Sequence, residues 1–143
     1  MAVNDIHIDA PPDEVFALLA DGKRYADWVV GAKYIRSVDP DWPAPGSKFH
    51  HTIGIGPIEI KDNTQVRSVD APNCLVLEAR LRPLGRATVK LEVEAAEGGS
   101  LVRMTEEPIK VPTIVKRLLD PPILARNAEA LRRLRDLVAP TDN

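Results

Sequence analysis

The sequence lacks a cysteine framework, an excess of charge of either sign and any long apolar run. Cys74 is its single cysteine, so an internal disulfide cannot form, and a reducing compartment fits best. The 19 basic and 21 acidic residues give a net charge of -2. This balance lacks the basic footprint of a nucleic-acid-binding protein, and we therefore expect no nucleic acid partner.

No apolar stretch approaches the ~18 residues that a bilayer span requires, so we expect no integral membrane association. The N-terminus has no basic start followed by an apolar run, which argues against a signal peptide and favours a cytoplasmic protein. The 143 residues suit one domain with one core. Because no repeat, linker or low-complexity segment interrupts them, we expect a single domain over residues 1–143. No pattern in the sequence indicates an oligomeric state.

Much of the chain alternates apolar and polar residues, which is typical of antiparallel strands that are wet on one face. Residues 85–94 are the clearest case, because Ala87, Val89, Leu91 and Val93 alternate there with charged or polar residues. The glycine-containing segments 54–57 and 97–100 indicate tight turns. The pattern predicts seven strands, at residues 3–9, 34–38, 47–53, 58–68, 75–81, 85–94 and 101–109.

Helical signals occupy two places in the chain. Pro11 and Pro12 suit the first turn of a helix after the first strand, and a second short helix should pass through Tyr25 and Trp28. After Pro112 we expect a helical turn over 113–119, then a stop at which Asp120 caps a new helix over about 122–138. The arginine-rich stretch 126–135 should form its solvated face. Its inner stripe should contain Ile123 or Leu124, Asn127 or Ala128, and then Leu131, Leu134 and Val138.

This order of elements predicts an α+β fold of the helix-grip kind. A curved antiparallel sheet of about seven strands would wrap around the long C-terminal helix, with two short helices after the first strand. One helix is only ~10 Å wide and cannot fill such a twisted sheet. We therefore expect an internal cavity, and a small hydrophobic molecule as the partner that fills it.

Six segments of the chain together resemble the START/Bet v 1-like superfamily, in particular its bacterial polyketide cyclase/dehydrase-like branch. The segments are IDAPPDEVF at 8–16, YADW at 25–28, PGSKF at 45–49, DNTQV at 62–66, GSLVRMTEEP at 99–108 and RNAEALRRL at 126–134. The resemblance spans nearly the whole chain and implies a hollow helix-grip fold. It also implies binding of lipids, hormones or polyketides, with cyclisation or dehydration catalysed in some members.

Strand alternation predicts which polar side chains face inward. The apolar phases of their strands carry His51, Asp62, Thr64 and Glu106 to the inside, and the helix stripe carries Asn127 there. Each could instead be satisfied by backbone or water, and Trp28 could simply pack in the core. The predicted ligand-binding residues are Trp28, His51, Ile60, Asp62, Thr64, Leu77, Leu91, Met104, Glu106 and Asn127.

Two functions remain open at this point. The first is binding of a lipid-, polyketide- or isoprenoid-like molecule without chemistry. The second is a cyclase or dehydratase in which His51 acts with Asp62 or Glu106 as acid and base. His50 and His51 point to opposite faces of one strand, so we expect no metal site. The sequence contains no P-loop, no dinucleotide-binding fingerprint and no G-x-S-x-G motif, and we expect no cofactor.

Overall fold

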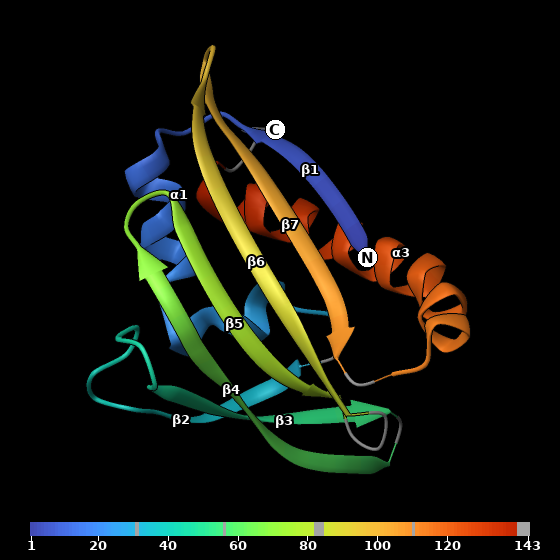
Figure 1. Ribbon diagram of the computed structural model, residues 1–143. Helices are drawn as coiled ribbons and strands as arrows, with labels where there is room; N and C mark the ends of the chain where they lie inside the picture. The colour runs from blue at the N-terminus through green and yellow to red at the C-terminus, as the bar shows by residue number, and fades with distance from the viewer. Residues whose placement is uncertain (31, 56, 82–84, 110, 140–143) are drawn as a thin grey trace.

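The computed structural model describes residues 1–30, 32–55, 57–81, 85–109 and 111–139. One antiparallel sheet dominates it, with the strand order β1-β7-β6-β5-β4-β3-β2 (Figure 1). The predicted α+β helix-grip architecture is confirmed, and each strand lies within a few residues of its predicted position. The strands are β1 Ala2–Ile8, β2 Ala32–Val38, β3 Lys48–Ile55, β4 Ile58–Asp70, β5 Cys74–Leu81, β6 Gly85–Ala96 and β7 Gly99–Ile109.

Short helices follow β1, and one long helix follows β7. Helix α1 (Pro12–Leu19) begins at a proline and carries two acidic residues in its first turn, where they face the positive end of the helix dipole. A 3-10 turn (Gly22–Arg24) and helix α2 (Tyr25–Trp28) come next. Helix α3 (Thr113–Val138) contacts β1, β7 and α2, and runs behind β6 and β7 in Figure 1. The helices therefore cover one face of the sheet.

Helix α3 is continuous, so the predicted stop at Asp120 is wrong. Pro121 and Pro122 lie inside the helix, where they lack the N–H groups that would bond the carbonyls of Arg117 and Leu118. All four of these residues are exposed, and water can therefore bond to the freed carbonyl groups. The Asp120 carboxylate lies 3.3 Å from the Met1 ammonium group instead of capping a helix.

Four predicted positions of the inner stripe of α3 are buried, namely Ile123, Asn127, Leu131 and Leu134. Ala130, which was not predicted, is buried as well, and Val138 is only half-buried. The turn of about 100° per residue brings Ile123, Asn127, Ala130 and Leu134 onto one narrow face, and Leu131 flanks it. All five of these side chains are buried. Leu124 lies a further 100° around the helix from Ile123 and is 37% exposed, so it does not belong to the stripe.

A tight turn between β6 and β7 holds one end of the sheet together. Gly98 adopts a positive φ of 78° there, which suits glycine. A Cβ on the next residue, Gly99, would collide with the carbonyl oxygen of Ile8, so only glycine allows β1 to lie this close. The predicted turn at 97–100 is confirmed. The other predicted turn, at 54–57, includes residue 56 and so lies partly outside the described residues.

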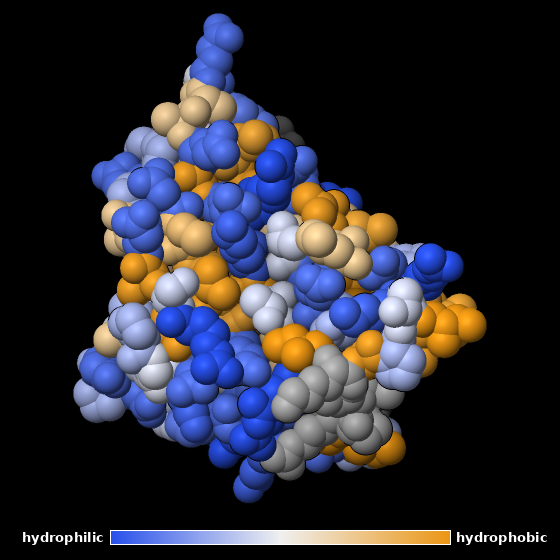
Figure 2. Space-filling model, viewed as in Figure 1, coloured by the Kyte–Doolittle hydropathy of each residue, from blue (hydrophilic) through white to orange (hydrophobic). Residues whose placement is uncertain are grey.

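The outward face of the molecule is mixed in polarity. On it Glu78 is buried beneath two cations, because Arg67 and Arg86 both form ion pairs with its carboxylate. Figure 2 shows an apolar area at the right of the view, where α3 begins, and Ile114 and Leu118 are the large exposed apolar side chains of that segment. Among the described residues, no helix combines the length and apolar character that a bilayer span requires.

Candidate functional site

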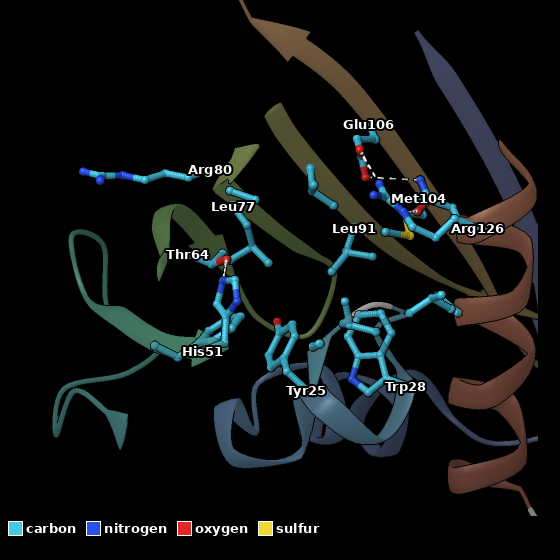
Figure 3. Close-up of a pocket in the computed structure, with 18 residues that line it drawn as sticks. Tyr25, Trp28, His51, Thr64, Leu77, Arg80, Leu91, Met104, Glu106 and Arg126 are labelled. Carbon is cyan, nitrogen blue, oxygen red and sulfur yellow. Dashed lines mark hydrogen bonds and ion pairs between the residues drawn. The ribbon is translucent and has the colours of Figure 1, made fainter. Parts of the chain in front are cut away.

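A cavity of about 310 Å³ lies between the sheet, the segment around α2, and α3 (Figure 3). Its position follows from the fold, because one helix and two short ones cannot fill the concave face of seven twisted strands. The size is at the lower end of the range for small-molecule pockets. The lining residues are Tyr25, Trp28, Val29, Val30, Ala32, Phe49, His51, Thr64, Leu77, Ala79, Arg80, Val89, Leu91, Met104, Glu106, Arg126, Asn127 and Ala130.

The middle of the cavity is apolar. Leu77, Leu91 and Met104 come from β5, β6 and β7, and face Trp28 on α2 (Figure 3). All four side chains are buried within the main hydrophobic core cluster. Such walls gain free energy when an apolar ligand replaces water against them, at roughly 25 cal/mol per Å² of buried surface.

One polar group of residues lies at the α3 end of the cavity. Glu106 on β7 is 3% exposed, and Arg126 Nη2 donates to its Oε2 at 2.6 Å. Asn127 Nδ2 donates to the other carboxylate oxygen, Oε1, at 3.3 Å. A buried carboxylate is costly without such partners. Here the guanidinium of Arg126 supplies the opposite charge, and both carboxylate oxygens of Glu106 accept a hydrogen bond.

A second polar group lies at the other end of the cavity, on β3 and β4. His51 is 6% exposed, and its Nε2 lies 3.1 Å from the Thr64 hydroxyl. Its other ring nitrogen, Nδ1, is buried and has no hydrogen-bond partner among the described residues. Burial lowers the pKa of His51, and the nearby charges of Arg36 and His50 lower it further, whereas Asp62 opposes them. The imidazole is therefore neutral at neutral pH.

An aromatic cluster closes the cavity on the side of α2. The ring of Tyr25 stacks on Phe49, with centroids 4.4 Å apart, and lies 5.1 Å from the ring of Trp28. The Tyr25 hydroxyl donates to the carbonyl of Leu19 at 2.8 Å. Burial raises the pKa of Tyr25, which keeps the phenol protonated. Trp42 packs edge-on against Phe49. This cluster fixes the position of α2 over the sheet.

The structure brings most of the predicted site residues to one cavity. It leaves Ile60 and Asp62 outside the lining, although Asp62 is buried as its strand phase predicted. The Asp62 carboxylate accepts a hydrogen bond from the backbone N–H of Asn63 at 2.9 Å and lies 4.0 Å from Arg80 Nε. Its charge is thus engaged beside the cavity. The predicted residues that line it are Trp28, His51, Thr64, Leu77, Leu91, Met104, Glu106 and Asn127.

Arg126 is the main site residue that sequence reasoning missed. Its place in an arginine-rich stretch predicted a solvated helix face, but its guanidinium reaches into the cavity toward Glu106. Its spacing in the sequence could have indicated this position. Residue 126 lies about one helical turn from both Ile123 and Ala130, and it therefore flanks the inner stripe. Arg80, which was not among the predicted site residues, also lies at the margin of the cavity.

The geometry does not form the acid/base pair that the sequence left open. Figure 3 shows His51 and Glu106 at opposite ends of the cavity, with apolar side chains between them. The Glu106 oxygens are bonded to Arg126 and Asn127, and the partner of His51 Nε2 is a hydroxyl. Within the described part of the chain, no three His, Cys, Asp or Glu side chains gather in a way that could hold a metal ion.

Titration of His51 should make the protein less stable in mild acid. Its pKa in the fold lies below the value of about 6.5 expected in the unfolded chain, so the unfolded chain takes up the proton first as the pH falls. The stability due to neutral His51 is therefore complete above about pH 6.5 and declines below it. Urea unfolding at about pH 7.5 and about pH 5.5 should show this loss.

The matched variants for this experiment are His51→Gln and His7→Gln. His51→Gln removes the buried titrating group and should reduce the loss of unfolding free energy in acid. His7 lies at the surface with its side chain 44% exposed, so His7→Gln should keep the loss. An equal acid loss in His51→Gln and the unchanged protein would contradict the assignment to His51.

Comparisons with known proteins agree with this architecture. A structure from Mesorhizobium loti is 18% identical with a TM-score of 0.75, covering 99% of this chain and 98% of that chain. Ara h 8.0201 is 13% identical with a TM-score of 0.73, and 97% of each chain is covered. The di-domain ARO/CYC protein StfQ from the steffimycin biosynthetic pathway is 9% identical with a TM-score of 0.74, covering 95% of this chain and 49% of that chain. At these identities, the likeness shows the fold.

Family assignment comes from the sequence match. No curated protein matches the chain. The model of the family described as polyketide cyclase / dehydrase and lipid transport matches residues 2–139, which is nearly the whole chain. The chain therefore belongs to the polyketide cyclase/dehydrase and lipid transport family.

Proposed function

We propose that this protein binds a small, mainly apolar molecule in the cavity between the sheet and α3. The observation that carries the proposal is the distribution of polarity in the cavity. Apolar side chains line its middle, while Glu106, Arg126 and Asn127 stand at one end and His51 and Thr64 at the other. The apolar walls would supply affinity, and the few polar groups would orient the ligand. The single cysteine favours a reducing compartment such as the cytoplasm for this binding.

Cyclisation or dehydration in the same cavity has less support. A general acid or base must reach the reacting atoms and carry a proton that it can give or take. Both carboxylate oxygens of Glu106 accept hydrogen bonds from Arg126 and Asn127. Among the described residues, no carboxylate contacts a ring nitrogen of His51. Binding requires none of these contacts to break, and it is the function that the geometry supports best.

Filling the cavity should abolish binding. Ala79 on β5 lines the cavity, and Ala79→Trp would place an indole where a ligand would lie. We expect the neutral dye N-phenylnaphthylamine to gain fluorescence with the unchanged protein, because it enters an apolar site, and to gain none with Ala79→Trp. Fluorescence titration measures both affinities.

Val76→Trp is the matched control for this experiment. Val76 lies on the same strand but points to the other face, outside the cavity lining. This variant should bind the dye as the unchanged protein does, and circular dichroism should show that both variants are folded. Dye binding that survives Ala79→Trp in the folded protein would place the site elsewhere and contradict the proposal.

A further inference from the structure

His51 carries a buried polar atom that the fold itself does not satisfy. Nδ1 has no hydrogen-bond partner among the described residues, yet its ring is 6% exposed and lines the cavity. A buried polar group without a partner is expensive, and proteins pair nearly all of them. His51 lines the cavity, so a ligand held there is the candidate partner for Nδ1.

Thr64 decides whether Nδ1 is a donor or an acceptor. A neutral imidazole carries its proton on one nitrogen, and Nε2 contacts the Thr64 hydroxyl at 3.1 Å. That hydroxyl has no other hydrogen-bond partner in the described part of the chain. If Nε2 donated to it, both the hydroxyl proton and Nδ1 would be left unpaired. If the hydroxyl donates to Nε2 instead, only Nδ1–H remains, so the second arrangement is favoured.

We propose that the cavity selects ligands with a carbonyl oxygen, which accepts a hydrogen bond from Nδ1–H of His51. This inference rests on the proposed binding function and adds the chemical class of the ligand. The carbonyl oxygen is an acceptor without a proton of its own, so it satisfies Nδ1–H completely. A hydroxyl at the same place could accept as well, but its own proton would then be buried without an acceptor.

The opposite end of the cavity agrees with this preference for acceptors. Both oxygens of Glu106 already accept hydrogen bonds, from Arg126 and Asn127. The side-chain oxygen of Asn127 lies 3.5 Å from Arg126 Nε. Arg126 lines the cavity and is partly exposed, and its Nη1 group donates to no partner among the described residues, so this end also contains a donor that a ligand could use. Both ends of the cavity therefore offer donors to a ligand.

A pair of matched ligands tests the inference. Displacement of N-phenylnaphthylamine measures the affinities of the methyl ketone of undecane and of the corresponding secondary alcohol, which share one carbon skeleton. We expect the unchanged protein to bind the ketone at least about fivefold more tightly than the alcohol. Undecane itself should also displace the dye, because the apolar walls are the same for all three molecules.

Two variants should remove this preference. In Thr64→Val nothing fixes the position of the imidazole proton, so His51 can donate to the ketone or accept from the alcohol, and the affinity ratio should fall to near one. The double variant His51→Phe with Thr64→Val keeps the shape but has no polar atom there, and it should not discriminate either. Thr88→Val, on the other face of β6 and outside the cavity lining, is the control and should keep the fivefold ratio.

The possible outcomes separate this inference from the proposed function. Equal binding of ketone and alcohol to the unchanged protein would overturn the carbonyl preference and leave apolar binding intact. Failure of all three molecules and of the dye to bind would overturn both. Nitrogen NMR of the histidine ring provides a test without a ligand, since Nδ1 should carry the proton and Nε2 should not. The reverse assignment would overturn the inference.

Discussion

Replacing Leu131 by alanine should lower the free energy of unfolding by about 2–5 kcal/mol. Leu131 is 1% exposed and belongs to the main core cluster, together with Ala130 and Leu134 from the same helix. The change removes buried methyl and methylene groups and leaves an empty space that the packed sheet and α3 can only partly close. Because α3 is the long element that covers the sheet, the loss should appear in the stability of the whole fold.

Leu124→Ala is the matched control, because the same side chain is removed from the same helix. Leu124 is largely outside the core, and its truncation should change the free energy of unfolding by about 0.5 kcal/mol or less. Chemical denaturation of both variants gives the two values, and the shared helix propensity of the substitutions cancels. Equal losses at the two positions would mean that the inner stripe of α3 is assigned wrongly.

Replacing Arg126 by methionine should cost about 2–3 kcal/mol of unfolding free energy. Removing one partner of a fully buried ion pair costs about 3–5 kcal/mol, because the other charge is left uncompensated. Glu106 is buried, but the Arg126 side chain is 36% exposed, so water already shares part of its charge and the loss is smaller. Asn127 would still donate to Glu106, which limits the loss further.

A second substitution shows whether the uncompensated charge of Glu106 causes the loss of stability in Arg126→Met. Glu106→Gln in the Arg126→Met background removes the charge and should recover a large part of the lost stability. Arg132→Met is the control on the same helix, because Arg132 lies at the surface and its one ion-pair partner in the described part of the chain is Glu129. Its effect should stay within about 0.5 kcal/mol. If the double variant were as unstable as Arg126→Met alone, the loss would come from packing and not from the buried carboxylate.

Local patterns explain why so much of the fold was predictable. Apolar and polar residues alternate cleanly in strands that have one wet and one dry face, so β6 and β7 could be located to within a few residues. The same alternation predicted correctly that His51, Asp62, Thr64 and Glu106 are buried. The prediction that the helix breaks at Asp120 was wrong, although two prolines follow it. Proline removes backbone hydrogen bonds from a helix, but an exposed turn tolerates this loss because water can bond to the freed carbonyl groups.

The candidate site was harder to predict, because a strand phase says which face a side chain is on but not what lies opposite it. Asp62 faces inward, yet its carboxylate is engaged by Asn63 and Arg80 beside the cavity. Arg126 belongs to an arginine-rich stretch, which is typical of an exposed helix face. Its guanidinium nevertheless turns inward, because it pairs with the buried Glu106 on a strand that is distant in the sequence. Long cationic side chains can reach around a helix in this way, and no short sequence window shows where their partners are.

The sequence by itself determined the order of the strands, the buried face of the strands that alternate clearly and most of the residues that form the inner side of α3. These are consequences of side-chain periodicity, which acts within a few residues of the chain. Only the tertiary structure decided that Glu106 meets Arg126 and Asn127, and that His51 meets Thr64 with Nδ1 left unpaired. Those contacts depend on how far the sheet curves and where α3 crosses it, and both are set by the packing of the whole core.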